Sequence, residues 1–341
     1  MSQTKAQLID AAATFTISSD ASFNSVSIGK GANSVAGNTV LGESALDASV
    51  SGGNNTAVGI SALTENTSGT NNVAVGRNSL DTNTSGGNNV ALGANALDGN
   101  TTASNNTAVG NAALLSNTTG TGNTAAGANA LDANTTGNNS ASFGMSSLGA
   151  NTTGGNNCAF GHSALAVNTT ASFNTAVGTD ALKANTTGAN NVAVGAYTLD
   201  ANTTGSSNTG CGWGSLGGNT TGTQNTAVGL RALRANTTAD NNTAVGYYAL
   251  DSNTTGDSNT AVGMTCLSAN TTANDNTGIG YYSLAANTTG ASNTGLGKGT
   301  VRNNTTGSDN TGVGKNALNA NTTASNNTAV GSDALTANTT G

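Results

Sequence analysis

Few side chains in this sequence are of the types that carry out catalysis, and their positions do not bring them together. The single histidine, His162, stands in a variable position after a repeated glycine. The acidic residues mostly follow a leucine and are spread along the chain, as at Asp98, Asp132, Asp200 and Asp251. No set of nucleophile, base and orienting group can be proposed. We therefore expect no enzymatic activity, no catalytic residue and no cofactor.

The three cysteines, Cys158, Cys211 and Cys266, occupy three different positions of an internal repeat. Cys158 and Cys211 are three repeats apart, roughly 14 Å if each repeat advances the chain by about 4.8 Å, which is too far for a disulfide. Other repeats carry Thr, Val or Ala at these positions. We expect all three cysteines to be small, buried, apolar side chains.

The sequence predicts neither a metal site nor glycosylation. A calcium-binding β-roll repeats an aspartate at a fixed place, whereas this repeat has asparagine or threonine there, and neutral amides are poorer calcium ligands than carboxylates. Asn-x-Ser/Thr triplets such as Asn66-Thr67-Ser68 recur, but the first residues, MSQTKAQLID, lack the apolar segment of a secretory signal. We expect these asparagines to form ladders between repeats.

Large side chains follow the repeated glycine in five consecutive repeats. We call these residues, together with two tyrosines in the next position, the aromatic stripe: Trp213, Leu230, Tyr247, Met264, Tyr281, Tyr248 and Tyr282. Neighbouring repeats in a solenoid lie about 4.8 Å apart, so the stripe is expected to be continuous. Two interpretations remain open. The stripe is either a contact between protomers or a platform for a host receptor or glycan, since aromatic rings suit both.

These residues are positioned by a glycine that returns at every seventeenth position, from Gly59, Gly76 and Gly110 through to Gly331. A fixed period over most of a 341-residue chain indicates a stack of small units. Charged residues make up 7% of the chain, proline is absent and the net charge is −7. With only 9 Lys and Arg, nucleic-acid binding is not expected. No apolar run is long enough to insert into a membrane.

Each repeat predicts a short strand, as at Thr107-Ala108-Val109, because side-chain type alternates with period two. The apolar Val109 position is expected to face inward, the Thr107 position likewise, and the Ala108 position outward. Gly110 then ends the strand at a tight corner. Asn117-Thr118-Thr119-Gly120 has the composition of a second corner.

Leucines at Leu63, Leu114 and the equivalent positions supply core side chains from the opposite side of each repeat. Asparagines at Asn66, Asn117 and their equivalents are expected to bond to their neighbours above and below. Two strands and two corners in each repeat describe a flattened β-roll. The sequence thus predicts an all-β fold, a parallel β-solenoid of about 17 regular 17-residue coils.

The run Asn71-Asn72-Val73-Ala74-Val75-Gly76 resembles the head repeat of YadA-like trimeric autotransporter adhesins, and the run from Phe23 to Ala32 resembles it too. The resemblance implies a left-handed parallel β-roll and three chains side by side. The period here is longer than in that family, and no signal peptide or membrane anchor is recognised. The opening residues and the NTAVG…AL…NTTG repeats look like those of phage tail-fibre proteins.

Three regions are predicted: residues 1–23 as a docking or capping segment, 24–52 as irregular first coils, and 53–341 as a repeat shaft. We expect a homotrimeric fibre shaft of a virion that binds a baseplate or neighbouring fibre protein. A bacterial surface adhesin that recognises a host glycan or receptor, located outside the cell, is the first alternative. An ice-binding solenoid is the second, disfavoured because the Thr107 position is expected to point inward. The chain ends at a regular repeat, so the open edge is expected to continue or to be covered.

Overall fold

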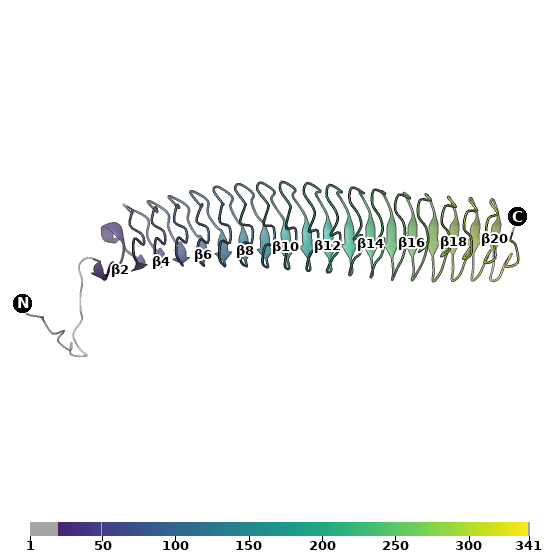
Figure 1. The fold of residues 1–341 in the computed structure, drawn as a ribbon, viewed down its shortest axis with the longest axis horizontal. Helices are drawn as coiled ribbons and strands as arrows, with labels where there is room; N and C mark the ends of the chain where they lie inside the picture. The colour runs from purple at the N-terminus through teal and green to yellow at the C-terminus, as the bar shows by residue number, and fades with distance from the viewer. Residues whose placement is uncertain (1–19, 49, 340–341) are drawn as a thin grey trace, which may run out of the picture.

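The computed structural model describes residues 20–48 and 50–339, and these form one long parallel β-solenoid (Figure 1). The coils stack along the long axis, with one three-residue strand above another, and the regular strands begin one repeat apart in the sequence. The predicted all-β solenoid of about 17 regular coils is confirmed. Most of the proposed segment 1–23 lies outside the described residues.

The strands are short and their spacing is regular throughout. Their bounds, with one short 3-10 turn, are β1 Ala21–Phe23, β2 Val26–Gly29, η1 Ala32–Ser34, β3 Thr39–Gly42, β4 Thr56–Val58, β5 Val73–Val75, β6 Val90–Leu92, β7 Thr107–Val109, β8 Thr124–Ala126, β9 Ala141–Phe143, β10 Cys158–Phe160, β11 Thr175–Val177, β12 Val192–Val194, β13 Thr209–Cys211, β14 Thr226–Val228, β15 Thr243–Val245, β16 Thr260–Val262, β17 Thr277–Ile279, β18 Thr294–Leu296, β19 Thr311–Val313 and β20 Thr328–Val330.

Strands β3 to β20 pair in parallel and in register, so that Thr107 lies opposite Thr124 and Val109 opposite Ala126. At the N-terminal end the pattern changes. β1 and β2 form an antiparallel hairpin, and β2 pairs antiparallel with β3. This hairpin occupies the hydrogen-bonding edge of β3, which would otherwise be open to other chains.

The strand faces are the reverse of the prediction. The middle residue of each strand, Ala108 in β7, is fully buried, whereas Thr107 is half-buried and Val109 is exposed. The expected inward positions of Thr107 and Val109, and the outward position of Ala108, are therefore wrong. The reason is space: in each coil the leucine, Leu114 or its equivalent, already fills the interior, so the strand can contribute only a small side chain.

Each regular coil has one strand, not the two that were predicted. The side opposite the strand is a run of turns, in which the repeated leucines have positive φ, for example φ 55° at Leu63 and φ 53° at Leu114. Left-handed backbone is unfavourable for leucine by about 1–2 kcal/mol per residue. Burying these leucines completely in the inner coils, as at Leu63 and Leu114, offsets this by about 2–3 kcal/mol. Bonds between coils, such as Leu63 N–H to the Ser79 carbonyl (3.0 Å), hold the run in place.

The repeated glycines form the corner that was predicted. Gly110 has φ 133°, and a Cβ atom there would lie 2.6 Å from the carbonyl oxygen of Gly127 in the next coil. Both the backbone angle and the close approach require glycine. Gly59 and Gly76 have the same surroundings.

Two columns of asparagine run through the interior as hydrogen-bonded ladders, as predicted. The Nδ2 of Asn117 donates to Oδ1 of Asn100 (3.0 Å) and to the carbonyl of Gly120 (3.0 Å). Nδ2 of Asn106, in the second column, donates to the same Gly120 carbonyl (2.8 Å). Asn66 and Asn117 are fully buried, so these Asn-x-Ser/Thr sites are inaccessible to a glycosylating enzyme in the folded chain.

Candidate functional site

The residues considered for catalysis remain apart in the structure. His162 is exposed, and Asp98, Asp132 and Asp200 lie on separate coils, each partly buried. Burial raises the pKa of all three carboxyl groups above the ordinary value. Among residues 20–48 and 50–339, no group of three or more His, Cys, Asp or Glu side chains could hold a metal ion. That the chain is not an enzyme stays a prediction.

The cysteines do not share one environment. Cys266 is fully buried, as predicted, and burial raises its pKa to about 12. Cys158 and Cys211 lie in the outward positions of β10 and β13, where Cys158 is half-buried and Cys211 exposed. The prediction of burial is wrong for these two because it depended on the reversed strand faces. All three are free thiols.

The outward side of the strands forms one continuous surface. We define the strand face as the first and third residues of β3 to β20, which point away from the interior. Threonine fills most first positions, and every third position holds Val, Leu, Ile, Phe, Ala or Cys. Neither position holds a charged residue in any of these strands. The strands lie side by side in one row, so the face runs along the whole rod (Figure 1).

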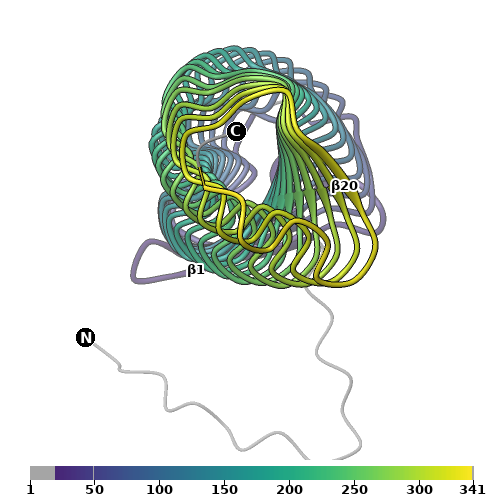
Figure 2. The same cartoon turned by 90° about the vertical axis from the view of Figure 1, so that its right-hand side faces the viewer.

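The apolar side chains of the strand face are substantially open to solvent in the single chain. Val177 is 37% exposed and Leu92 is 47% exposed. Phe143 and Phe160 stack on each other with ring centroids 4.5 Å apart. Viewed along the axis, successive coils are rotated slightly, so the face follows a gradual twist (Figure 2). A continuous apolar face of this length is typical of an interaction surface.

The aromatic stripe is exposed, as its position after the corner glycine suggested. Its members after the glycine lie between 40% and 51% exposed, a range that includes Trp213, Leu230, Tyr247, Met264 and Tyr281. Tyr248 and Tyr282, in the next position, stand beside Tyr247 and Tyr281, with ring centroids 4.3 Å apart in both pairs. The structure therefore brings these predicted residues together, but as separate pairs with Leu230 and Met264 between them.

An arginine side chain packs against one ring of each tyrosine pair. The Arg231 guanidinium lies over the ring of Tyr248, 4.4 Å from its centroid, and Nη1 donates to the tyrosine hydroxyl (2.7 Å). Arg302 lies over Tyr282 at 4.8 Å. A side-chain hydrogen bond with Tyr248 raises the pKa of Tyr247. Tyr248 and Tyr282 thus each lie between an arginine and the neighbouring tyrosine ring.

Asp251 anchors two arginines of the preceding coil. Its carboxylate accepts from Nε of Arg234 (3.1 Å) and lies 3.5 Å from Nη2 of Arg231. The Asp251 side chain is only 13% exposed, whereas that of Arg234 is 46% exposed. The guanidinium of Arg234 is thus held in place from one side while its other side remains open to solvent.

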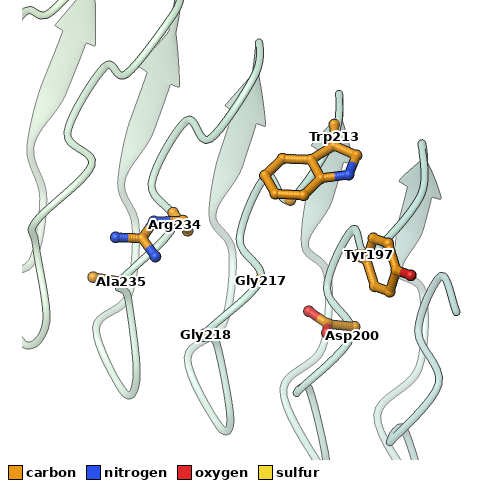
Figure 3. Close-up of a pocket in the computed structure, with 8 residues that line it drawn as sticks. Tyr197, Asp200, Trp213, Gly217, Gly218, Arg234 and Ala235 are labelled. Carbon is orange, nitrogen blue, oxygen red and sulfur yellow. The ribbon is translucent and has the colours of Figure 1, made fainter.

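A hollow of about 480 Å³ lies at the N-terminal end of the stripe (Figure 3). Its walls carry two aromatic rings, one carboxylate and one guanidinium, and its floor is glycine backbone. The residues that line it are Tyr197, Asp200, Trp213, Gly214, Gly217, Gly218, Arg234 and Ala235. The rings of Tyr197 and Trp213 meet edge to face, with centroids 6.1 Å apart.

The hollow exists because one coil lacks side chains that other coils have. Gly214, Gly217 and Gly218 belong to the same coil, between Asp200 of the preceding coil and Arg234 of the following one. A Cβ atom at Gly217 would lie 3.2 Å from Oδ1 of Asp200. This site was not predicted from the sequence, although three glycines at positions that normally hold side chains were a signal that could have indicated it.

No protein-family model matches this chain, and a search of curated proteins found no significant relative. Within the described residues, no helix has the length and apolar character needed to cross a bilayer. Two surfaces therefore bear on the function of the chain: the strand face, and the aromatic stripe with its hollow.

Proposed function

We propose that this chain is the shaft of a homotrimeric fibre, and that the fibre belongs to a virion. The observation that carries the proposal is the strand face, which is uncharged and carries an unbroken row of apolar third residues along the rod, beside a row that is mostly threonine. The resemblance of the repeats and opening residues to trimeric adhesin heads and phage fibres supports both the trimer and the virion. In this role the rod separates a host-attachment tip from a baseplate or neighbouring fibre protein.

The dimensions of the strand face suit self-association. Eighteen strands spaced about 4.8 Å apart, each about 10 Å long, give a face of roughly 800 Å² per chain, similar to the surface that one partner buries in a standard interface. In a trimer each chain shares this face between two neighbours. A trimer with rotational symmetry about the rod axis repeats one contact three times and closes on itself. Every repeat of the sequence forms the same coil. Parallel chains that touch through their strand faces can therefore repeat the same coil-to-coil contact along the whole rod.

Two native cysteines report on this interface directly. We expect Cys211, exposed in the single chain, and Cys158 to be protected from a maleimide reagent in the native protein, because a neighbouring chain covers the strand face. Cys266 should also be protected, since it is buried and its pKa of about 12 leaves almost no thiolate near neutral pH. Mass spectrometry of peptides after brief labelling separates the three sites.

Protein unfolded in urea provides the matched control for the labelling, because all three thiols should then react. Labelling of native Cys211 at the rate seen in urea would contradict the covered strand face. Labelling of Cys266 would instead indicate that the coil itself had opened. An uncovered strand face and an unfolded coil can therefore be distinguished.

Ice binding is a second candidate, because the threonines that were expected to point inward lie on the outer side of the strands. Threonines of the strand face point outward at the strand spacing of about 4.8 Å, forming a regular array of hydroxyl and methyl groups that could order water. Thermal hysteresis of the purified protein is the test. Hysteresis from a monomer would favour ice binding over the fibre, whereas a trimer without hysteresis would favour the fibre.

A further inference from the structure

The hollow beside Trp213 has the composition of a small polar-ligand site rather than of a protein contact. Asp200 and Arg234 place one negative and one positive group on its walls, and glycine backbone forms its floor. A contact between copies of the chain would run along many coils, as the strand face does. The hollow instead depends on a single coil, the only one in the described residues with glycine at the positions of 214, 217 and 218 together.

The aromatic wall is formed by Trp213 and Tyr197, whose rings are in contact in the chain without a ligand. Trp213 is 51% exposed, and the edge-to-face contact with Tyr197 defines the direction of its ring. Figure 3 shows the indole above the glycine floor, with Tyr197 and Asp200 on one side and Arg234 on the other. A flat aromatic surface that is partly open to water suits a ligand with one apolar face and polar edges.

The polar groups supply a donor and an acceptor of opposite charge. Arg234 uses Nε for Asp251, so its terminal nitrogens can donate to a ligand. The carboxylate of Asp200 accepts hydrogen bonds, and burial, aided by the charge of Asp180, raises its pKa. One carboxylate and one guanidinium on opposite sides of the hollow match the hydroxyl groups of a neutral polyol better than they match a ligand with net charge.

We propose that this hollow binds a neutral saccharide, with one pyranose ring stacked on Trp213 and its hydroxyls bonded to Asp200 and Arg234. A volume of about 480 Å³ is within the range of small-molecule sites. The site lies beyond the corner glycine and shares no residue with the strand face, so it does not depend on the proposed trimer. Such a site would give the rod a recognition role of its own.

The test uses the chain's single tryptophan, whose emission reports on the hollow alone. The full-length protein is titrated with maltotriose, cellotriose, lactose and chitotriose, and with sialyllactose as an acidic probe. We expect at least one neutral sugar to change the emission in a saturable way, with a Kd of about 0.1–10 mM, the weak range of a shallow site. No saturable change with any neutral sugar, or one with sialyllactose only, would overturn the proposal.

Two glycine variants provide a matched comparison. Gly217→Asn fills the hollow with a residue that the same repeat position carries at Asn319, and should weaken binding at least tenfold. Gly149→Asn is the control, because Gly149 occupies the equivalent position with nearly the same surroundings, 3.3 Å from Asp132 Oδ1, outside the hollow. Equal binding by both variants would contradict the assignment. Light scattering on the same samples keeps this result separate from the oligomer proposal.

Discussion

At the scale of single residues, a glycine in one coil makes room for a larger interior side chain in the coil before it. Four strands have glycine at the buried middle position, and in each case the facing residue of the preceding coil is larger than the usual alanine. A Cβ atom at Gly278 would lie 2.5 Å from Sγ of Cys266, and one at Gly312 would lie 2.5 Å from Cγ2 of Thr300. Gly210 and Gly295 face Thr198 and Ser283 in the same way. The pairing is what a tightly packed, inward-facing middle position requires.

This pairing predicts strong coupling between Cys266 and Gly278. Gly278→Ala alone should lower the free energy of unfolding by about 1–3 kcal/mol, because the added methyl group overpacks the interior. The double variant Cys266→Ala/Gly278→Ala recreates the alanine pair that other coils have at Ala113 and Ala125, and should recover most of that loss. Urea unfolding followed by circular dichroism measures both. Simply additive losses would contradict the inward assignment of the middle residue.

At the scale of elements, the asparagine ladders hold one coil to the next through the interior. In the middle of the rod, an amide such as that of Asn117 bonds to the coil before it, to the coil after it and to its own corner carbonyl. The Thr118-type hydroxyl continues the pattern outside, donating to the Thr135 carbonyl of the next coil (3.0 Å). Polar groups thereby supply cohesion that a core of one leucine and two small residues per coil cannot provide alone.

Removing one ladder amide should destabilise the stack. Asn117→Ala leaves Oδ1 of Asn100 without its interior donor, and should cost about 2–4 kcal/mol. Asn111→Ala is the matched control, because Asn111 lies on the surface of the same coil and should change stability by less than about 0.5 kcal/mol. Thermal unfolding by circular dichroism compares the two. Equal effects would mean that the ladder contributes nothing beyond a surface asparagine.

The period, the corners and the ladders could be predicted because each repeats one residue type for one local reason. The glycine corner needs positive φ, and the stacked amides need a partner in every coil. The strand faces could not be predicted from alternation alone, since a shift of one residue exchanges the two sides. Val109 looks like a core residue because the sequence does not show that the interior has room for only one large side chain in each coil, that of Leu114. The hollow at Trp213 was missed because it arises from absent side chains in a single coil, whereas the exposed stripe was found because its large side chains recur at two adjacent repeat positions.

At the scale of the whole molecule, the corrected strand faces place a row of apolar side chains on the surface of the rod, where another chain can contact them. The apolar third positions, Val177 and Val194 among them, lie on the surface, where they pair in register between β11 and β12. The outward Leu41, near the N-terminal hairpin, and Val330, in the last strand, belong to the same face. A chain with this surface and a net charge of only −7 is expected to bury the face against copies of itself.

The mass of the native protein in solution, measured by light scattering, tests this account most directly. A Val177→Lys/Val194→Lys variant should shift toward the single-chain mass while keeping its circular dichroism spectrum, because both side chains point away from the interior. For the unaltered protein we predict three times the chain mass of 32.7 kDa. A mass of 32.7 kDa, unchanged as the protein is concentrated, would contradict the proposed fibre.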